Sequence, residues 1–370
     1  MRLSDFDYKL PSGLIAQTPA SPRDHSRLLV LNRANQKIED KNFYNLAGYL
    51  KKGDVLVLNN TKVMPARLIG KKVLTGGKIE VFLLKKNLPQ PSFSVKLRAD
   101  ASKRGETKKE EWQCLVGGPV KTLGLEVEFD KKLIAKIIKD NQDGTWQVEF
   151  NQAGKKLTKT INEIGLIPLP PYIKKLSKGD KQRYQTVFAL DKKVGSAAAP
   201  TAGLHFTDKL IRDLKKIGVQ FEYVTLHVGL GTFASVKTDD IKEHKMHSEW
   251  AEIDKKTLSK LREAKKENRR IIAVGTTSIR TLESAWQEKN LEYFSWTSIF
   301  IYPGYKFKVV DAMITNFHVP KSTLLMLVSA FVGENYKDKK VGVEIIKKVY
   351  KHAIEKKYSF LSYGDAMLID

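Results

Sequence analysis

The feature that most limits how this chain can fold is a change of pattern along it. Residues 66–151 consist of short runs rich in β-forming side chains, separated by glycine-containing turns, and no helical periodicity interrupts them. The clearest runs are residues 79–82, 93–97 and 125–129. Short, closely spaced strands are typical of small closed or stacked sheets, so this stretch predicts a small all-β barrel or sandwich.

Helical and strand patterns alternate on both sides of this stretch. Thr207 is a suitable N-cap for a helix with one apolar face that ends at Gly218, and residues 219–226 have the pattern of the strand that follows. Residues 271–274 read as a fully buried strand, and residues 278–286 as a helix. Alternation of this kind is typical of a sheet covered by helices.

The sequence therefore predicts a mixed fold of the α/β (α+β) type. A layered α/β domain is expected from residues 1–65 and 155–370, with a β-barrel domain of residues 66–154 inserted into it. A length of 370 residues is enough for two domains. The longest apolar run, residues 324–332, is about half as long as a membrane-spanning helix. It predicts a buried helix and no contact with a membrane.

The charge balance points to a polyanionic partner without establishing one. Lys and Arg number 65 against 41 Asp and Glu, so the formal net charge is +24. Clustered cations bind nucleic acids by releasing counterions, whereas lysines spread evenly over solvated faces need no partner. The one cysteine, Cys114, excludes an internal disulfide and a cysteine-based zinc site, and a single thiol fits a reducing cytoplasmic location.

Three stretches place glycines and polar side chains where core packing does not require them. The first, residues 199–207, includes Thr201, Gly203 and His205 and leads into the helix after Thr207. Backbone N–H groups at such a turn can bind an anion. The alternative, favoured for a lone histidine, is that His205 only caps the helix.

The second stretch follows a predicted strand and contains His227, Gly229, Gly231 and Thr232. Glycines there let a ligand approach the backbone, and ligands of α/β sheets bind at the carboxyl ends of strands. Two glycines after a strand also make an ordinary turn. The adjacent His227 is what gives this stretch its value.

The third stretch, residues 274–280, reads as a strand, a tight turn and a helix start, with Gly275, Thr276, Thr277 and Ser278 at the turn. It can hold a carboxylate or phosphate. Capping of the helix by Thr277 or Ser278 explains the hydroxyls almost as well. The Walker spacing is absent.

The remaining histidines raise the question of a metal. His247 and Glu249 lie in residues 244–249, and Asn316, His318 and Lys321 lie in residues 315–323. Without an H-E-x-x-H motif or a cysteine pair, a zinc site is the weaker interpretation. General acid–base catalysis by one or two histidines is the better one.

These stretches, with several others, make the chain resemble the S-adenosylmethionine:tRNA ribosyltransferase-isomerase family. The resemblance covers nearly the whole chain and is carried by residues 5–8, 26–29, 63–68, 199–207, 224–233, 246–249, 274–284, 299–305, 314–331 and 360–369. Asn60 and Lys62 depart from it, because the family often has Asp and Arg there. Lys lacks the bidentate fork of Arg.

The resemblance implies an α/β domain with an inserted β-barrel and an enzyme of queuosine biosynthesis. Its substrates would be S-adenosylmethionine and tRNA carrying 7-aminomethyl-7-deazaguanine (preQ1) at the wobble position. Its products would be epoxyqueuosine-tRNA, adenine and methionine. S-adenosylmethionine is then a substrate, and neither a cofactor nor a metal is expected. The default expectation for the assembly is a monomer.

The implied chemistry assigns roles to the polar residues. His205 or His227 would remove the ribose C5′ proton, and His318 or Asp365 would protonate or orient the leaving adenine. The methionine carboxylate would be held by Gly275, Thr276, Thr277 and Arg280, with Arg280 supplying charge. The expected substrate-binding residues, for S-adenosylmethionine or the tRNA base, are Thr201, Gly203, Gly229, Gly231, Thr232, His247, Glu249, Gly275, Thr276, Thr277, Ser278, Arg280, Asn316, Lys321 and Tyr363.

The tRNA requires its own contacts, because anticodon-loop bases are often bound by stacking on aromatic rings. The candidates are Phe206, Phe233, Tyr302, Tyr305 and Tyr363, each of which could instead be a core residue. Two other function classes stay open. One is a basic RNA-binding module without catalysis, and the other is a zinc-dependent hydrolase that uses the histidines.

Overall fold

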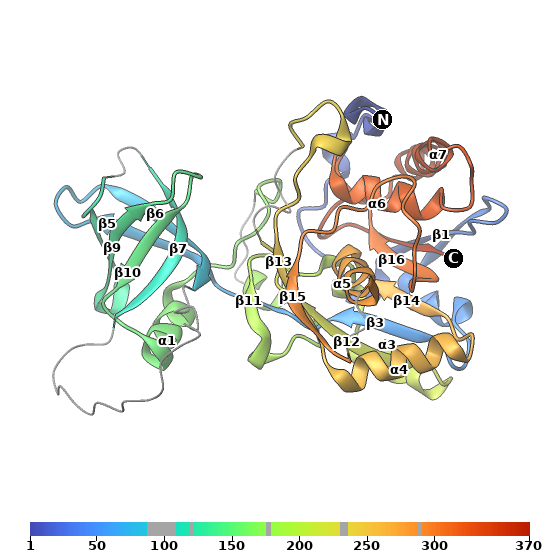
Figure 1. Cartoon of the computed structure of the whole chain (residues 1–370), viewed down its shortest axis with the longest axis horizontal. Coiled ribbons are helices and arrows are strands. Elements are labelled where there is room, and N and C mark those ends of the chain that lie inside the picture. Colours follow the sequence, from blue (N-terminus) through green and yellow to red (C-terminus); the bar gives the residue numbers. More distant parts are fainter. Residues whose placement is uncertain (87–108, 119–121, 175–178, 230–235, 288–290) are drawn as a thin grey trace. The chain divides into compact units, whose positions relative to one another are not determined.

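The computed structural model describes residues 1–86, 109–118, 122–174, 179–229, 236–287 and 291–370. Within them the chain divides into two compact units (Figure 1). The larger unit joins Met1–Val63 to Leu169–Asp370, and the smaller one is Met64–Pro168. The fold is the predicted mixed α/β class with a closed six-stranded β-barrel.

The larger unit is built on a nine-stranded sheet in the order β15-β13-β12-β3-β14-β16-β17-β1-β2. Strands β12, β3, β14 and β16 run parallel to one another, and β13 and β17 flank them in the opposite direction. A short pair, β11 with β4, lies outside the sheet. The strands are β1 Arg27–Leu31, β2 Ile38–Asn42, β3 Val55–Asn59, β4 Lys62–Val63, β11 Val194–Ser196, β12 Gln220–Leu226, β13 Glu249–Ile253, β14 Ile271–Val274, β15 Tyr293–Thr297, β16 Ala312–Asn316 and β17 Ala366–Ile369.

Helices cover both faces of this sheet. The helices of the unit are α2 Asp180–Arg183, α3 Asp208–Lys216, α4 Lys255–Lys266, α5 Thr276–Gln287, α6 Thr323–Val332 and α7 Val341–Glu355, and its 3-10 turns are η1 Leu3–Phe6, η2 Ser12–Leu14, η3 Arg23–His25, η4 Phe43–Tyr49, η6 Asp191–Lys193, η7 Thr201–His205 and η9 Ile241–Glu243. Alternate residues of the central strands face opposite cores: Val55 and Val57 pack with α4–α7, and Leu56 and Leu58 with α3 and η4. Burial on both faces explains why the parallel strands read as continuous apolar runs.

The local patterns account for most element boundaries. Thr207 caps α3 as predicted, with its Oγ1 accepting a hydrogen bond from the Leu210 N–H at 3.1 Å. The helix expected from residue 278 starts two residues earlier, so capping by Thr277 or Ser278, the alternative interpretation of their hydroxyls, does not hold. That helix begins at Thr276, and the Ser278 hydroxyl instead donates to the Val274 carbonyl at 2.8 Å. The apolar run at residues 324–332 forms the buried helix α6. In the described part of the chain, no helix is both long and apolar enough to cross a membrane.

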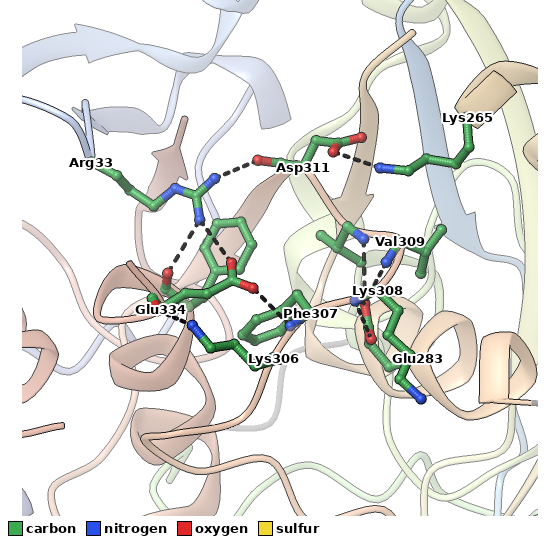
Figure 2. Close-up of polar contacts among 11 residues, drawn as sticks. Arg33, Lys265, Glu283, Lys306, Phe307, Lys308, Val309, Asp311 and Glu334 are labelled. Atoms are coloured by element: carbon green, nitrogen blue, oxygen red, sulfur yellow. Dashed lines mark hydrogen bonds and ion pairs between the residues drawn. The ribbon is translucent and has the colours of Figure 1, made fainter. Parts of the chain in front are cut away.

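The segment that leads into β16 is held by two carboxylates (Figure 2). Glu283 on α5 accepts hydrogen bonds from the backbone N–H groups of Lys308 and Val309, at 2.9 and 3.1 Å. Glu334 accepts from the Phe307 N–H at 2.8 Å and lies 3.7 Å from the Arg33 guanidinium. These contacts fix the entry of β16, the strand that ends at Asn316.

The smaller unit is the closed barrel, in the order β10-β7-β6-β5-β8-β9. Its elements are β5 Arg67–Lys72, β6 Lys78–Lys86, β7 Glu110–Gly117, β8 Glu126–Phe129, η5 Asp130–Lys132, β9 Leu133–Asp140, β10 Trp146–Phe150 and α1 Gly154–Ile164. Cys114 is buried in its core. The expected domain boundary after residue 154 falls at the start of α1, which packs on the barrel core through Leu157 and Ile161. The expected strand at residues 93–97 lies outside the described residues.

Candidate active site at the carboxyl edge of the sheet

Most of the residues singled out in the sequence lie along one edge of the nine-stranded sheet. The parallel strands β12, β3, β14 and β16 end there, at Leu226, Asn59, Val274 and Asn316. Because β13 and β17 run the other way, their first residues lie at the same edge. Carboxyl ends of parallel strands are the usual place for ligands in α/β sheets, so this edge is the candidate site.

His227 follows β12 directly and is the least enclosed of the motif histidines at this edge. Its Nδ1 lies 2.8 Å from the hydroxyl of Thr61, which is fully buried and itself approaches the Lys193 carbonyl at 3.4 Å. If Thr61 donates to that carbonyl, it accepts from Nδ1–H, and Nε2 carries the lone pair. Burial lowers the pKa of His227, although the nearby Glu252 carboxylate raises it. A neutral imidazole with a lone pair on Nε2 can accept a proton.

Glu249 and Arg280 form a buried ion pair at the same edge of the sheet. Glu249 is the first residue of β13, Arg280 lies in the second turn of α5, and their side chains are 3% and 6% exposed. The other carboxylate oxygen of Glu249 accepts a hydrogen bond from the Gly229 N–H at 2.9 Å. Three stretches far apart in the sequence therefore meet here.

The turn between β14 and α5 has the backbone that its glycine predicts. Gly275 has a φ of +86°, a left-handed conformation that favours glycine. Thr276 is buried at the start of α5, and the hydroxyl oxygen of Thr277 is buried without a hydrogen-bond partner among the described residues. The expected binding residue Ser278 is fully buried, and its hydroxyl is bonded to the Val274 carbonyl.

His205 is enclosed in a hydrogen-bond network. Its Nδ1 lies 2.7 Å from the Ser26 hydroxyl, its Nε2 lies 3.2 Å from the Asn316 amide nitrogen, and its ring stacks on Phe43. Burial, with a smaller contribution from Arg23, lowers the pKa of His205 to about 3. Both ring nitrogens are in use, so the imidazole has no lone pair left for a substrate proton.

His318 and Asp365 are also held by internal contacts. His318 is buried, its Nε2 lies 2.9 Å from the Thr315 hydroxyl, and burial lowers its pKa to about 3. The two Asp365 oxygens accept hydrogen bonds from the backbone N–H groups of Arg27 and Ser359, both at 2.7 Å. Burial raises the pKa of Asp365, and those two bonds oppose the rise.

The other expected binding residues divide into those at the edge and those away from it. Thr201 donates to Asn316 at 3.0 Å and connects η7 to the end of β16. Gly203 and Tyr363 are buried in packing contacts. His247 is exposed, and Lys321 is exposed and paired with an Asp7 oxygen at 2.7 Å. Gly231 and Thr232 lie outside the described residues.

Of the aromatic residues considered for base stacking, Phe206 and Tyr363 are buried core residues. Tyr302 and Tyr305 are half-buried, and Phe233 lies outside the described residues. Of the basic residues Lys103, Arg104, Lys108 and Lys109 in the barrel part of the sequence, only Lys109 is described, and it pairs with Glu149 at 2.8 Å. In the described part of the chain, no group of three or more His, Cys, Asp or Glu side chains is arranged to hold a metal ion.

The comparisons with known proteins decide the family. A family model described as "Queuosine biosynthesis protein" matches residues 3–369. The chain belongs to that family. It is 47% identical over 373 residues to the S-adenosylmethionine:tRNA ribosyltransferase-isomerase of Halothermothrix orenii, with all of both chains covered. It is 46% identical over 372 residues to the enzyme of that name from Thermotoga petrophila, again over both full lengths.

A solved structure supports the same assignment. The S-adenosylmethionine tRNA ribosyltransferase from Thermotoga maritima is 38% identical, with a TM-score of 0.54, over 99% of this chain and 100% of that one. The queuosine biosynthesis family thus extends over both compact units. The chain is accordingly a transferase of the ribosyltransferase-isomerase type, as the sequence resemblance implied.

The two departures from the queuosine family pattern have partners within this chain. Asn60 is buried, and its side-chain oxygen accepts a hydrogen bond from the Thr225 hydroxyl at 2.8 Å, which a carboxylate would accept equally well. Lys62 forms an ion pair with Asp191. The Asn60 bond joins the residue after β3 to β12, whereas the Lys62 pair is a surface contact, since Asp191 is 91% exposed.

The sequence interpretation missed three residues that organise this edge. Thr61 contacts His227, Ser26 contacts His205, and Asn59 bonds to both the N–H and the carbonyl of Leu226. Asn59 and Thr61 follow an apolar strand in the same way as the motifs that were found, which is the signal that marks them. Ser26 has no such local signal.

Proposed function

We propose that this chain transfers and isomerises the ribosyl part of S-adenosylmethionine onto preQ1 at the wobble position of tRNA. The products are epoxyqueuosine-tRNA, adenine and methionine. Family membership supports the reaction class. The observation that carries the proposal is the half-buried His227, bonded to Thr61 at the carboxyl edge of the sheet, the edge that also holds the Glu249–Arg280 pair.

His227 is the general base in this proposal. The positive sulfur of S-adenosylmethionine acidifies the ribose C5′ proton, which the His227 Nε2 removes. The aminomethyl nitrogen of preQ1 then attacks the ribose-derived fragment as adenine leaves. Ring reorganisation displaces methionine and forms the epoxide. No step requires a metal or a redox cofactor.

His205 takes a positioning role. It orders Asn316 and Ser26 at the edge, and its hydrogen bonds and low pKa argue against proton abstraction. His318 and Asp365 support the neighbouring segments in the same way. Adenine would then be protonated by water or by a group on the tRNA.

The tRNA is expected to bind through the cation surplus. A net charge of +24 predicts affinity that falls steeply with salt, and the half-buried Tyr302 and Tyr305 are the remaining described candidates for base stacking. The proposal treats the enzyme as a monomer in the cytoplasm, where its tRNA substrate is found.

The test is release of free adenine from S-adenosylmethionine, with tRNA that carries preQ1 and with tRNA that carries guanine. Adenine and methionine are expected only with preQ1-tRNA, together with a mass gain on the tRNA. Replacing His227 by Ala should lower turnover by roughly 100-fold or more, the usual contribution of a general base.

His352→Ala serves as the matched control, because that histidine lies on α7 and bonds to Asp40. It should turn over as the wild type does. Turnover within a few-fold of wild type in His227→Ala would overturn the assignment of the base. Tight tRNA binding without any adenine release would favour the catalytically silent RNA-binding alternative.

A further inference from the structure

Arg280 is buried, and two of its three guanidinium nitrogens have no hydrogen-bond partner among the described residues. Its Nη1 pairs with Glu249, whereas Nε and Nη2 are buried and have no hydrogen-bond partner among the described residues. A buried donor without a partner is unfavourable by about 1–3 kcal/mol, and more when the group is charged. Two such donors on one side chain therefore point to a ligand that supplies the acceptors.

The two unused donors lie on the same edge of the guanidinium. The N–H groups of Nε and Nη2 point in nearly the same direction, and this edge binds a carboxylate through two parallel hydrogen bonds. Thr277 lies three residues earlier on α5 and therefore on the same helix face, and its buried hydroxyl also lacks a partner among the described residues. Three unpaired polar atoms thus mark one face of the first turns of α5.

The charges already present at the site limit which ligand can supply the acceptors. Glu249 already neutralises Arg280, so a dianionic phosphate would add two uncompensated charges to a buried site. A backbone phosphodiester carries bulky nucleosides on both sides and cannot reach donors on a side chain that is only 6% exposed. A single carboxylate at the end of a flexible chain, carried beside its own ammonium group, fits both limits.

We propose that the Nε–Nη2 edge of Arg280 binds the α-carboxylate of the methionine part of S-adenosylmethionine, with the Thr277 hydroxyl as an additional donor. This inference rests on the proposed function, because it assigns one end of the proposed substrate. It makes Arg280 a specificity residue: sulfonium nucleosides without the carboxylate leave two charged donors buried and unpaired.

The experiment measures binding of S-adenosylmethionine and of its decarboxylated analogue by calorimetry, without tRNA, to the wild type and to Arg280→Lys. Lys keeps the charge beside Glu249 and loses the fork. The wild type should bind S-adenosylmethionine roughly 100-fold more tightly than the analogue, as expected when one partner of a buried charged pair is removed. Arg280→Lys should abolish most of that preference and change the affinity for the analogue by less than about threefold.

Thr277→Val is a second test of the same site that remains valid if Arg280→Lys does not fold. Removing a buried hydroxyl that has no partner should leave the unfolding temperature unchanged or raise it, and should weaken S-adenosylmethionine binding by roughly tenfold. Arg212→Lys, on the exposed face of α3, is the matched control and should change neither measurement. If Arg280 had only a structural role, Arg280→Lys would lower the affinity for S-adenosylmethionine and for the decarboxylated analogue equally.

The outcomes separate this inference from the proposed function. Equal losses for both ligands in Arg280→Lys, or unchanged affinity in Thr277→Val, overturn the carboxylate assignment even if preQ1-tRNA releases adenine normally. Carboxylate-dependent binding without adenine release keeps the assignment and overturns the reaction.

Discussion

Arg280 and Glu283 lie one turn apart on α5, and they differ in how many of their hydrogen bonds the protein itself completes. Both side chains are buried and charged. Glu283 accepts hydrogen bonds from the backbone of residues 308–310 (Figure 2). The Tyr305 hydroxyl also donates to it, at 3.0 Å. Among the described residues, Arg280 pairs through Nη1 and leaves Nε and Nη2 without a partner. A side chain whose hydrogen bonds are all made within the protein stabilises the fold. A buried side chain with unpaired donors is expected to bind a ligand that supplies the acceptors.

The same comparison distinguishes the histidines at the sheet edge. His205 uses both ring nitrogens within the protein, with Ser26 and Asn316. His227 uses Nδ1 with Thr61, and no described residue bonds to its Nε2. A motif match cannot make this distinction, because both histidines sit in stretches typical of the family. What differs is which of their hydrogen bonds the chain itself completes.

The largest expected effect is on the closed network of Glu283. Glu283→Ala removes the acceptor of the backbone N–H groups of residues 308–310, of which Val309 and Val310 are buried, so the free energy of unfolding should fall by about 3–5 kcal/mol. Urea denaturation measures it. The folded fraction should keep its affinity for S-adenosylmethionine, since Glu283 bonds to Tyr305 and to the backbone of residues 308–310, whereas Arg280 bonds to Glu249. Glu263→Ala, at an exposed position of α4, should change stability by less than about 0.5 kcal/mol. A small effect at Glu283 would mean that the closed network does not hold the loop.

The next effect concerns the pH dependence of stability. Burial lowers the pKa of His205 and of His318 to about 3, so between that value and 6.5 the unfolded chain binds protons that the folded chain does not. The two buried histidines therefore do not reduce the free energy of unfolding above about pH 6.5, and they reduce it increasingly as the pH drops below that value. At pH 5 each histidine should account for a loss of about 2 kcal/mol relative to pH 7.

His318→Gln isolates one of these contributions, because a neutral amide can replace the bond from Nε2 to Thr315. The difference in unfolding free energy between pH 7 and pH 5 should be about 2 kcal/mol smaller in this variant than in the wild type. His25→Gln, at an exposed position, should keep the wild-type pH dependence. Equal pH dependence in His318→Gln and wild type would contradict a buried, neutral His318.

Much of the fold could be predicted from local patterns. The strand at residues 271–274, the capped helix after Thr207 and the β-rich middle stretch all rest on short-range periodicity and turn chemistry, which the sequence displays directly. The start of α5 was misplaced because hydroxyls near a helix start are compatible with two roles. Ser278 bonds back to the Val274 carbonyl and does not cap the helix.

The candidate site was only partly readable, because it depends on contacts between distant segments. The motifs that follow β12 and β14 were found, since glycines and polar residues after an apolar strand are a local signal. The pairing of Thr61 with His227 spans 166 positions, and that of Ser26 with His205 spans 179. No periodicity encodes such pairs; they follow from the strand order, which brings β3 next to β12 and β1 close to the end of β16.

The smallest expected effect tests whether the proton-accepting ability of His227 Nε2 depends on the hydrogen bond between Nδ1 and Thr61. Thr61→Val keeps the shape of a fully buried side chain and removes the hydroxyl that contacts Nδ1. Without it the imidazole can place its proton on either nitrogen, so turnover should fall by roughly tenfold, the lower range for loss of a residue that orients a catalytic group. Adenine release with preQ1-tRNA gives the rate, and ¹⁵N chemical shifts of the imidazole report which nitrogen carries the proton.

Thr61→Ser restores the hydroxyl, and it should recover most of the rate and the wild-type ¹⁵N pattern. A purely structural Thr61 would behave differently: Val and Ser would then both lower stability, the tautomer would stay unchanged in Val, and the rate would follow the folded fraction. The predicted combination is a lower rate with a mixed tautomer at nearly constant stability. This result would show that proton removal by Nε2 depends on the hydrogen bond at Nδ1. No such dependence is expected for His205 or Glu283, whose hydrogen bonds are completed within the protein.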